Sequence, residues 1–227
     1  MTWGQSLSEG LSPFLITYGV HMMSTSRTSE LEAVNTILSA VGEPPINSLD
    51  GQKNVDAAIA KNILSEVSRE VQTHGWHFNT QHGVKLQPSI DSHILLDESV
   101  VRVDIEHRSS SNTFEDLDIT QRGNKLFDRT NNTYVFSKDI EATVIYLLNW
   151  AELPEPARRF ITVKAARIFQ DRMVGSQAHH AFSQEDEIRA RALLKEFEGE
   201  TADHTIFGNY DVYRIVSRGD TSRGGLV

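Results

Sequence analysis

The sequence predicts an α+β protein in which an antiparallel bundle of about four helices is interrupted by a small antiparallel β-sheet or sandwich. Two observations lead to this class. Apolar residues recur at helical spacing on both sides of a middle segment and alternate with polar residues inside it. Glycine or proline stands where the period changes. We therefore expect a helical domain of residues 29–75 and 151–199, an inserted β domain of residues 76–150, and extended termini at residues 1–28 and 200–227.

Composition limits the function classes. The chain of 227 residues has no cysteine, which excludes disulfides, thiolate nucleophiles and cysteine-based zinc sites. No apolar run approaches the roughly 20 residues that span a bilayer, so no membrane partner is expected. The formal net charge of −9 opposes tight binding of nucleic acid. It suits a channel through which DNA slides without sticking.

The N-terminal extension contains a short apolar stretch, Pro13–Val20. A secretory signal has a positive region before such a stretch, whereas here the only preceding charge is Glu9. We interpret the stretch as part of an extension. Met22 or Met23 is an alternative starting residue.

The first helix is predicted over residues 29–41. Ser29 and Glu32 have the spacing of a capping box, and Gly42 followed by Pro44-Pro45 ends the helix. Its apolar face consists of Leu31, Val34, Ile37, Leu38 and Val41.

The second helix is predicted over residues 54–74, with Asn54 as N-cap and Gly75 as the stop. Four apolar residues spaced by four form its buried face, namely Ile59, Ile63, Val67 and Val71.

From Trp76 the period changes to two, and about six short strands are expected. Gly123-Asn124 has the length of a two-residue hairpin turn, and residues 106–115 are a polar loop. Val101, Val103 and Ile105 form the buried side of one strand. The alternation begins at Trp76 and Phe78 and includes Val84 and Leu86 before Pro88; the later strand segments are residues 101–105, 119–122, 125–128, 133–136 and 142–148.

Two helices follow the β domain. The third begins near Pro154–Pro156 and runs to Val174, with Gly175 as its stop. The fourth is predicted over residues 183–198, because Ser183 and Asp186 have capping-box spacing. Its residues Ile188, Leu194 and Phe197 are expected to face inward.

The third helix and the C-terminal arm supply the candidate interface residues. The basic side chains of the helix either form a solvated face or pair with an acidic face, such as the start of the fourth helix on a neighbouring subunit. The arm combines tyrosine and arginine, as interfaces do, although a disordered tail is the competing interpretation. The candidates are Arg158, Arg159, Lys164, Arg167 and Arg172 in the helix and Tyr210, Tyr213 and Arg214 in the arm.

No catalytic, metal or cofactor site is predicted. His74 and His77 are three residues apart, but Gly75 breaks the helix between them. A glycan hydrolase, which needs two carboxylates, is the alternative function. Its candidate carboxylates are Glu152, Glu155, Glu185, Asp186 and Glu187, each of which has a simpler role at a helix start.

Several motifs in order resemble one family. The pattern L-x-A-V-N-x-I-L-x-A-V-G-E-P-P covers residues 31–45 and G-W-x-F-N-T covers residues 75–80. R-G-x-x-x-x-D-R-T follows at residues 122–130, E-L-P-E at residues 152–155 and K-A-A-R-x-F at residues 164–169. The chain thereby resembles tail tubular protein A, the head-tail adaptor of short-tailed bacteriophages (podoviruses).

The resemblance implies a structural virion protein and not an enzyme. Members form a twelve-membered connector ring that binds the portal protein above and the tail nozzle, tail tubular protein B, below. The ring helps to anchor the tail fibres, and double-stranded DNA passes through its lumen during genome ejection without specific binding. The expected location is the virion tail, after assembly in the host cytoplasm.

Overall fold

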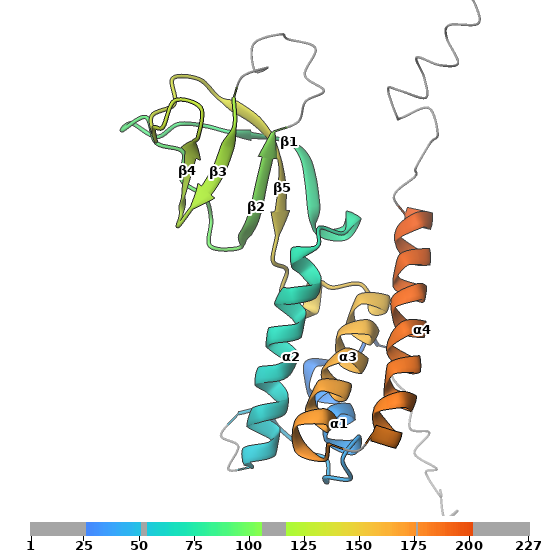
Figure 1. The fold of residues 1–227 in the computed structure, drawn as a ribbon. Helices are drawn as coiled ribbons and strands as arrows, with labels where there is room; N and C mark the ends of the chain where they lie inside the picture. The colour runs from blue at the N-terminus through green and yellow to red at the C-terminus, as the bar shows by residue number, and fades with distance from the viewer. Residues whose placement is uncertain (1–25, 51–53, 106–116, 176, 202–227) are drawn as a thin grey trace, which may run out of the picture.

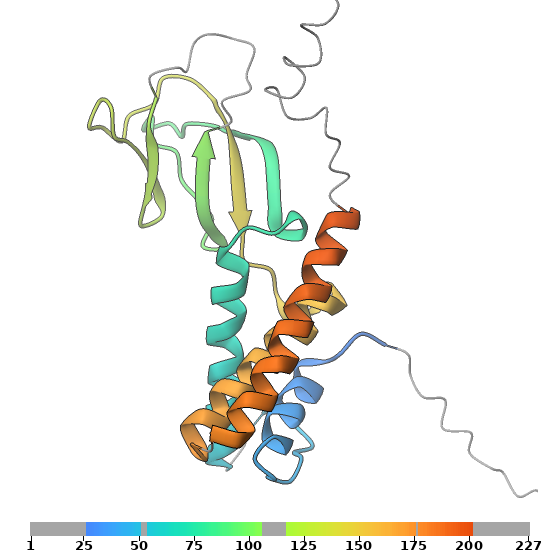
Figure 2. The ribbon, with the colours of Figure 1, turned by 45° about the vertical axis from the view of Figure 1, so that its right-hand side comes forward.

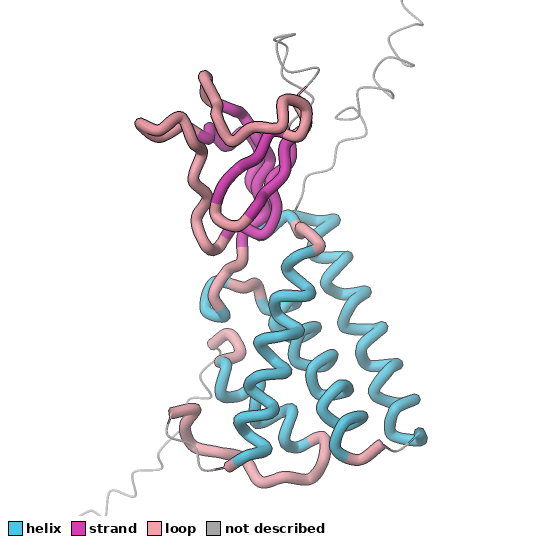
Figure 3. Tube along the Cα trace, turned by 60° about the vertical axis from the view of Figure 1, so that its left-hand side comes forward, coloured by secondary structure: helices cyan, strands magenta, loops and turns pink. Residues whose placement is uncertain are grey.

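A computed structural model of the chain describes residues 26–50, 54–105, 117–175 and 177–201. Within these ranges the four α-helices lie together in one half of an elongated molecule and the strands in the other half (Figures 1 and 3). The α+β class predicted from the sequence is confirmed.

Helices α1 (Glu30–Ser39) and α2 (Val55–Thr73) begin where their capping residues predict. Ser29 Oγ accepts the backbone N–H of Glu32, and the Glu32 carboxylate accepts the backbone N–H of Ser29. Asn54 Oδ1 accepts the N–H groups of Asp56 and Ala57. These bonds satisfy backbone donors that a helix start leaves unpaired, so both helices have a defined first turn.

Helix α3 (Glu155–Met173) is the central helix of the bundle and contacts α1, α2 and α4 (Gln177–Thr201) (Figure 1). Helix α4 begins before Ser183, so the capping box predicted at Ser183 and Asp186 is wrong and these residues lie inside the helix. Leu194 is buried against the bundle, but Ile188 is 63% exposed, contrary to its predicted inward position. Because α4 packs mainly on α3, its residues 184–201 bury only Ala190 and Leu194.

The β part contains two antiparallel sheets in the described residues. One has the order β1 (Thr80–Leu86), β5 (Ile140–Tyr146), β2 (Val100–Ile105). The other is the hairpin of β3 (Ile119–Arg122) and β4 (Lys125–Asp128), whose turn is the predicted Gly123-Asn124. Gly123 has φ +63°, as the first position of a type II′ turn requires.

Three strand predictions are corrected. Residues 133–136 form no strand, since only an isolated bridge joins Thr133 to Asp128. Residues 77 and 78 belong to the 3₁₀ turn η1 (His77–Asn79), and strand β1 begins only at Thr80. In β2 the register shifts between Val100 and Arg102, so Val100 is buried in place of Val101. A bulge changes the alternation, because it adds one residue to one side of the ladder.

Each half of the molecule has its own hydrophobic cluster. The bundle cluster is formed by α1, α2, α3 and α4, and Phe169 and Ile161 at its centre are fully buried. The β cluster contains Ile94, Leu126 and Val144 among its buried members. A second turn, η2 (Trp150–Glu152), leads from the sheet back to α3.

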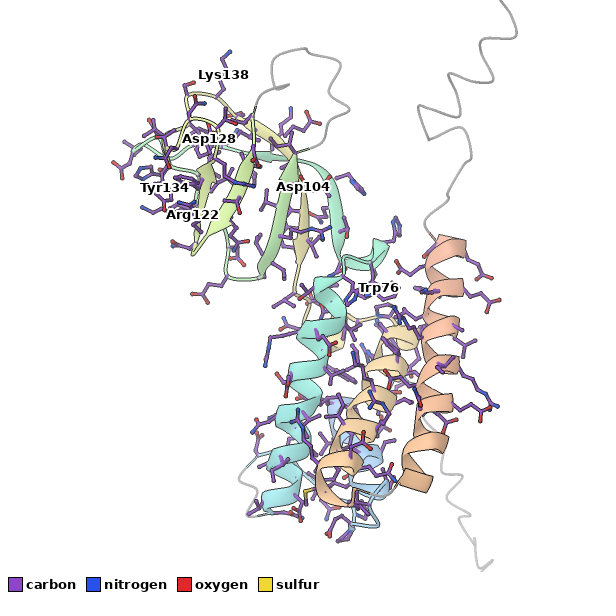
Figure 4. The ribbon with its side chains drawn as sticks, in the orientation of Figure 1. Trp76, Asp104, Arg122, Asp128, Tyr134 and Lys138 are labelled. Atoms are coloured by element: carbon purple, nitrogen blue, oxygen red, sulfur yellow. The ribbon has the colours of Figure 1, made fainter. Side chains whose placement is uncertain are left out.

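Two buried amides join the halves at the end of α2. Gln72 Oε1 accepts the backbone N–H of Leu148 at 2.7 Å, and Gln72 Nε2 donates to the Leu148 carbonyl at 3.2 Å. Asn79 Nδ2 donates to the carbonyls of Gln72 and Tyr146 at 2.9 and 2.8 Å. The chain enters the sheet through Asn79 and leaves it through Leu148, so these bonds hold both crossing segments on α2. Trp76 lies at this junction (Figure 4).

Gly75 makes the close approach of the two segments possible. Its φ is +76°, a left-handed conformation that favours glycine. A Cβ at this position would overlap the Cδ1 atom of Ile145 in β5 and lie 3.3 Å from its Cγ1. The sheet therefore packs directly on the backbone that ends α2.

Candidate subunit interface

The candidate residue Arg158 lies inside the bundle. It is 4% exposed, and its guanidinium donates to three backbone carbonyls, those of Leu153, Thr28 and Ala151, at 2.7–2.9 Å. Burial lowers the pKa of Arg158, as does the charge of Arg27, although Glu155 opposes this shift. Arg158 thus binds the segment before α1 to the start of α3.

Neighbouring groups hold the same segment. The Thr28 carbonyl also accepts the indole N–H of Trp150 at 3.0 Å. The Thr28 N–H donates to Glu155 Oε2 at 2.9 Å, and its hydroxyl donates to Glu155 Oε1. Both oxygens of Glu155 are therefore occupied within the chain.

Three further basic candidates pair with acidic residues of the same chain. Lys164 binds Glu70 of α2 at 2.7 Å, and Arg172 lies 3.6 Å from Glu66 of α2. Arg167 binds Glu187 of α4, and it also binds Asp171 at 3.2 Å. Burial alone would lower the pKa of Arg167, but the hydrogen bond and charge of Glu187, with those of Asp171, raise it. The sequence suggested pairing of this basic face with the acidic start of the fourth helix of a neighbouring subunit. In the structure Arg167 makes such a pair with Glu187 of α4 in the same chain.

Arg159 differs from the other four, because it is exposed and has no ion pair among the described residues. It lines a groove of about 380 Å³ between the start of α3 and the C-terminal half of α4. The floor of the groove is apolar, with Pro156, Leu193 and Phe197, and carboxylates of α4 stand on its rim. Leu193 is 59% exposed there. The arm candidates Tyr210, Tyr213 and Arg214 lie outside the described residues.

A second exposed surface lies at the far end of the β part, and sequence reasoning missed it. Tyr134 packs edge-on against Phe127, with ring centroids 4.8 Å apart, and Arg122 lies 3.6 Å above the Phe127 ring (Figure 4). Ile90 and Val135 are 104% and 56% exposed, and their two segments are joined by the Phe136 N–H, which donates to the Ser92 carbonyl at 2.8 Å. Their exposure was not evident, because residues 133–136 resemble a half-buried strand.

The bundle end carries exposed apolar side chains as well. Val55 begins α2, and Met173 and Val174 end α3. They are 69%, 45% and 54% exposed. Both helix ends lie at the bottom of Figure 1, opposite the strands. The elongated molecule therefore presents exposed apolar groups at both ends.

Four of the five carboxylates considered for hydrolysis are engaged in structural bonds. Glu152 accepts the N–H of Asn149 at 2.9 Å, and Glu185 pairs with Arg189. Glu155 binds Thr28 and Glu187 binds Arg167. In the described ranges no group of three or more histidine, aspartate and glutamate side chains is placed to hold a metal ion.

Comparison with protein families identifies the chain. The family model described as "Tail tubular protein" matches residues 31–204, which include the bundle and the β part. The chain belongs to the tail tubular protein family.

This membership makes it a structural protein of a bacteriophage tail, located in the virion tail. A comparison with curated proteins finds no match. Among the described residues of this tail tubular protein, no helix is long and apolar enough to cross a membrane.

Proposed function

We propose that this tail tubular protein is the ring-forming adaptor that joins the portal to the tail nozzle. Twelve copies surround a lumen through which double-stranded DNA passes, and the ring helps to anchor the tail fibres. The observation that carries the proposal is the family match over residues 31–204. The match spans both halves of the molecule, which supports a role for both halves in the assembly.

The distribution of exposed apolar groups supports an adaptor. A protein that joins two different partners needs two separate contact surfaces. Contiguous exposed apolar groups mark such surfaces in soluble proteins. Here one set lies at the bundle end, with Val55, Met173 and Val174, and another lies in the β part, with Ile90 and Val135. The bonds of Gln72 and Asn79 hold the two ends on one body.

The net charge of −9 supports passage of DNA. An acidic protein repels the phosphate backbone and offers few cations to replace its counterions. Within the described residues most cations of α3 are also neutralised by Glu66, Glu70 and Glu187. No observation favours the alternative glycan hydrolase, so that activity is not proposed.

The proposal is tested by mixing the purified chain with the portal and nozzle proteins of the same phage. Electron microscopy of negatively stained particles should show annular assemblies. Twelve copies of the 25.5 kDa chain have a mass of about 306 kDa. The native mass of the complex with the portal should exceed the mass of the portal alone by that amount. Failure to form a stoichiometric complex with either protein would overturn the proposal.

Matched surface variants separate the two ends. Ile90→Asp with Val135→Asp changes only the β end, and Val174→Asp changes only the bundle end. Each variant should lose one of the two partners and keep the other, with unchanged circular dichroism. Loss of the same partner by both variants would contradict the assignment of one partner to each end.

A further inference from the structure

The groove between α3 and α4 combines an apolar floor with a rim that carries charges of both signs. Its floor is apolar, and its rim carries one cation, Arg159, and two carboxylates, Glu196 and Glu200. Glu155 also lines the groove, but Thr28 already occupies its two oxygens. Leu193 is 59% exposed, so the groove lacks a cover among the described residues.

We infer that this groove binds residues 207–214 of the C-terminal arm of a neighbouring copy. The inference rests on the proposed function, because it assigns the contact between adjacent copies of the ring. The arm segment reads F-G-N-Y-D-V-Y-R.

The composition of the segment fits the groove. Tyrosine and phenylalanine bury large apolar areas, and tyrosine and arginine are enriched at the centres of interfaces. The segment carries charges of both signs, Asp211 and Arg214, as does the rim of the groove. Opposite charges across a contact select its register, so a mixed rim suits a mixed segment better than a uniformly basic or acidic one.

The position of the arm favours a neighbouring copy. Helix α4 ends at Thr201, one residue beyond the groove residue Glu200, and it runs upward to this end in Figure 2. Docking in the same groove would require the chain to reverse direction within a few residues. An extended chain spans about 3.3 Å per residue, so the docked segment can begin roughly 20 Å and end roughly 43 Å beyond the last turn of α4.

The proposed contact is a head-to-tail contact between two different surfaces, as a ring requires. Groove and arm are different surfaces, so each copy gives its arm to one neighbour and receives an arm from the other. Such heterologous contacts generate closed rings when the rotation permits. Burying Leu193 and Phe197 under the arm removes apolar surface from water, which favours association.

Disulfide trapping tests the inference directly, because the chain has no cysteine of its own. The variant Leu193→Cys with Tyr210→Cys places one thiol in the groove and one in the arm. The matched control is Ile188→Cys with Tyr210→Cys, since Ile188 is 63% exposed on α4 and does not line the groove. A disulfide requires Cα atoms within about 7 Å, so the pairs report docking and not mere proximity.

Both full-length variants are oxidised alone and bound to the portal protein, and are then separated under non-reducing denaturing conditions. Leu193→Cys with Tyr210→Cys should give a ladder of linked chains, and the control should give at least tenfold less. Disulfides within single chains, equal ladders in both pairs, or no disulfide in either state would overturn the inference.

The two proposals fail in different ways. Rings of the unmodified chain on the portal, together with no linkage between chains, would reject the arm contact and leave the adaptor function standing. Absence of any assembly of the unmodified chain with portal and nozzle would reject the adaptor function itself. Leu193→Asp, which keeps the arm, should weaken ring formation at least tenfold without changing the circular dichroism spectrum.

Discussion

Replacing Gly75 by alanine tests how tightly the sheet packs on the end of α2. The added Cβ must adopt φ +76°, which costs about 1–2 kcal/mol for a residue with a side chain. It also overlaps the Cδ1 atom of Ile145, which is only 2% exposed. Overpacking of a buried site costs about 1–3 kcal/mol, so Gly75→Ala should lower the free energy of unfolding by roughly 2–5 kcal/mol.

Two further variants separate the free-energy cost of the positive φ from the cost of the steric overlap with Ile145. Gly42 has φ +82°, and a Cβ there meets no atom within 4 Å, so Gly42→Ala should cost only the backbone term of about 1–2 kcal/mol. Ile145→Val removes Cδ1 and should itself cost about 0.5–1.5 kcal/mol. Gly75→Ala in the Ile145→Val background should then cost about as much as Gly42→Ala.

The assay is urea unfolding followed by circular dichroism at one fixed protein concentration, because self-association adds stability that depends on concentration. The reasoning predicts a coupling of about 1–3 kcal/mol between Gly75→Ala and Ile145→Val, which is the overpacking cost that Ile145→Val relieves. Effects that add within about 0.5 kcal/mol would refute it, since independent sites behave in that way.

Four other predictions concern buried polar contacts and a helix cap. Arg158→Met should destabilise the chain by about 3–5 kcal/mol because it leaves three backbone carbonyls without their donor, whereas Arg159→Met should change the thermal midpoint little. Gln72→Leu should cost about 2–4 kcal/mol in urea unfolding, since two bonds to a backbone segment are lost, and a cost below about 1 kcal/mol would show that the junction is not held by this amide. Ser29→Ala should cost about 1 kcal/mol through loss of the N-cap. The backbone and side-chain hydrogen bonds of Ser29 lower the pKa of Glu32, so the stability that the Glu32 charge contributes is present above pH 4.5 and is lost as the pH falls through the lowered pKa. The difference in Tm between Glu32→Gln and the unmodified chain should therefore narrow below pH 4.5. A difference in Tm that does not depend on pH would contradict this account.

Local signals predicted the helix starts and stops well. Ser29 and Asn54 cap the helices that they were expected to cap, and Gly75 and Gly175 follow the helix ends with positive φ. The hairpin turn at Gly123 was also predicted correctly. These features depend on hydrogen bonds and dihedral angles within a few residues, which the sequence states directly.

Features that depend on a distant partner were predicted less well. The alternation in β2 is shifted because a bulge opposite β5 changes its phase at Val100. Residues 133–136 have strand composition, but the bridge at Thr133 and the bond from the Phe136 N–H to the Ser92 carbonyl involve two different segments and form no ladder. Ser183 has capping chemistry, yet α4 starts earlier at Gln177.

The sequence by itself determined the class of each half, the order of its elements and the resemblance to the tail tubular family, because period, capping residues and motif order are properties of adjacent positions. Only the tertiary structure decided which charged residues are interior. Arg158 and Arg159 are neighbours of the same type, but one binds the Thr28 carbonyl inside the bundle and the other lines an open groove. The difference arises from the packing of segments far apart in the chain, which sets the burial and partners of each side chain.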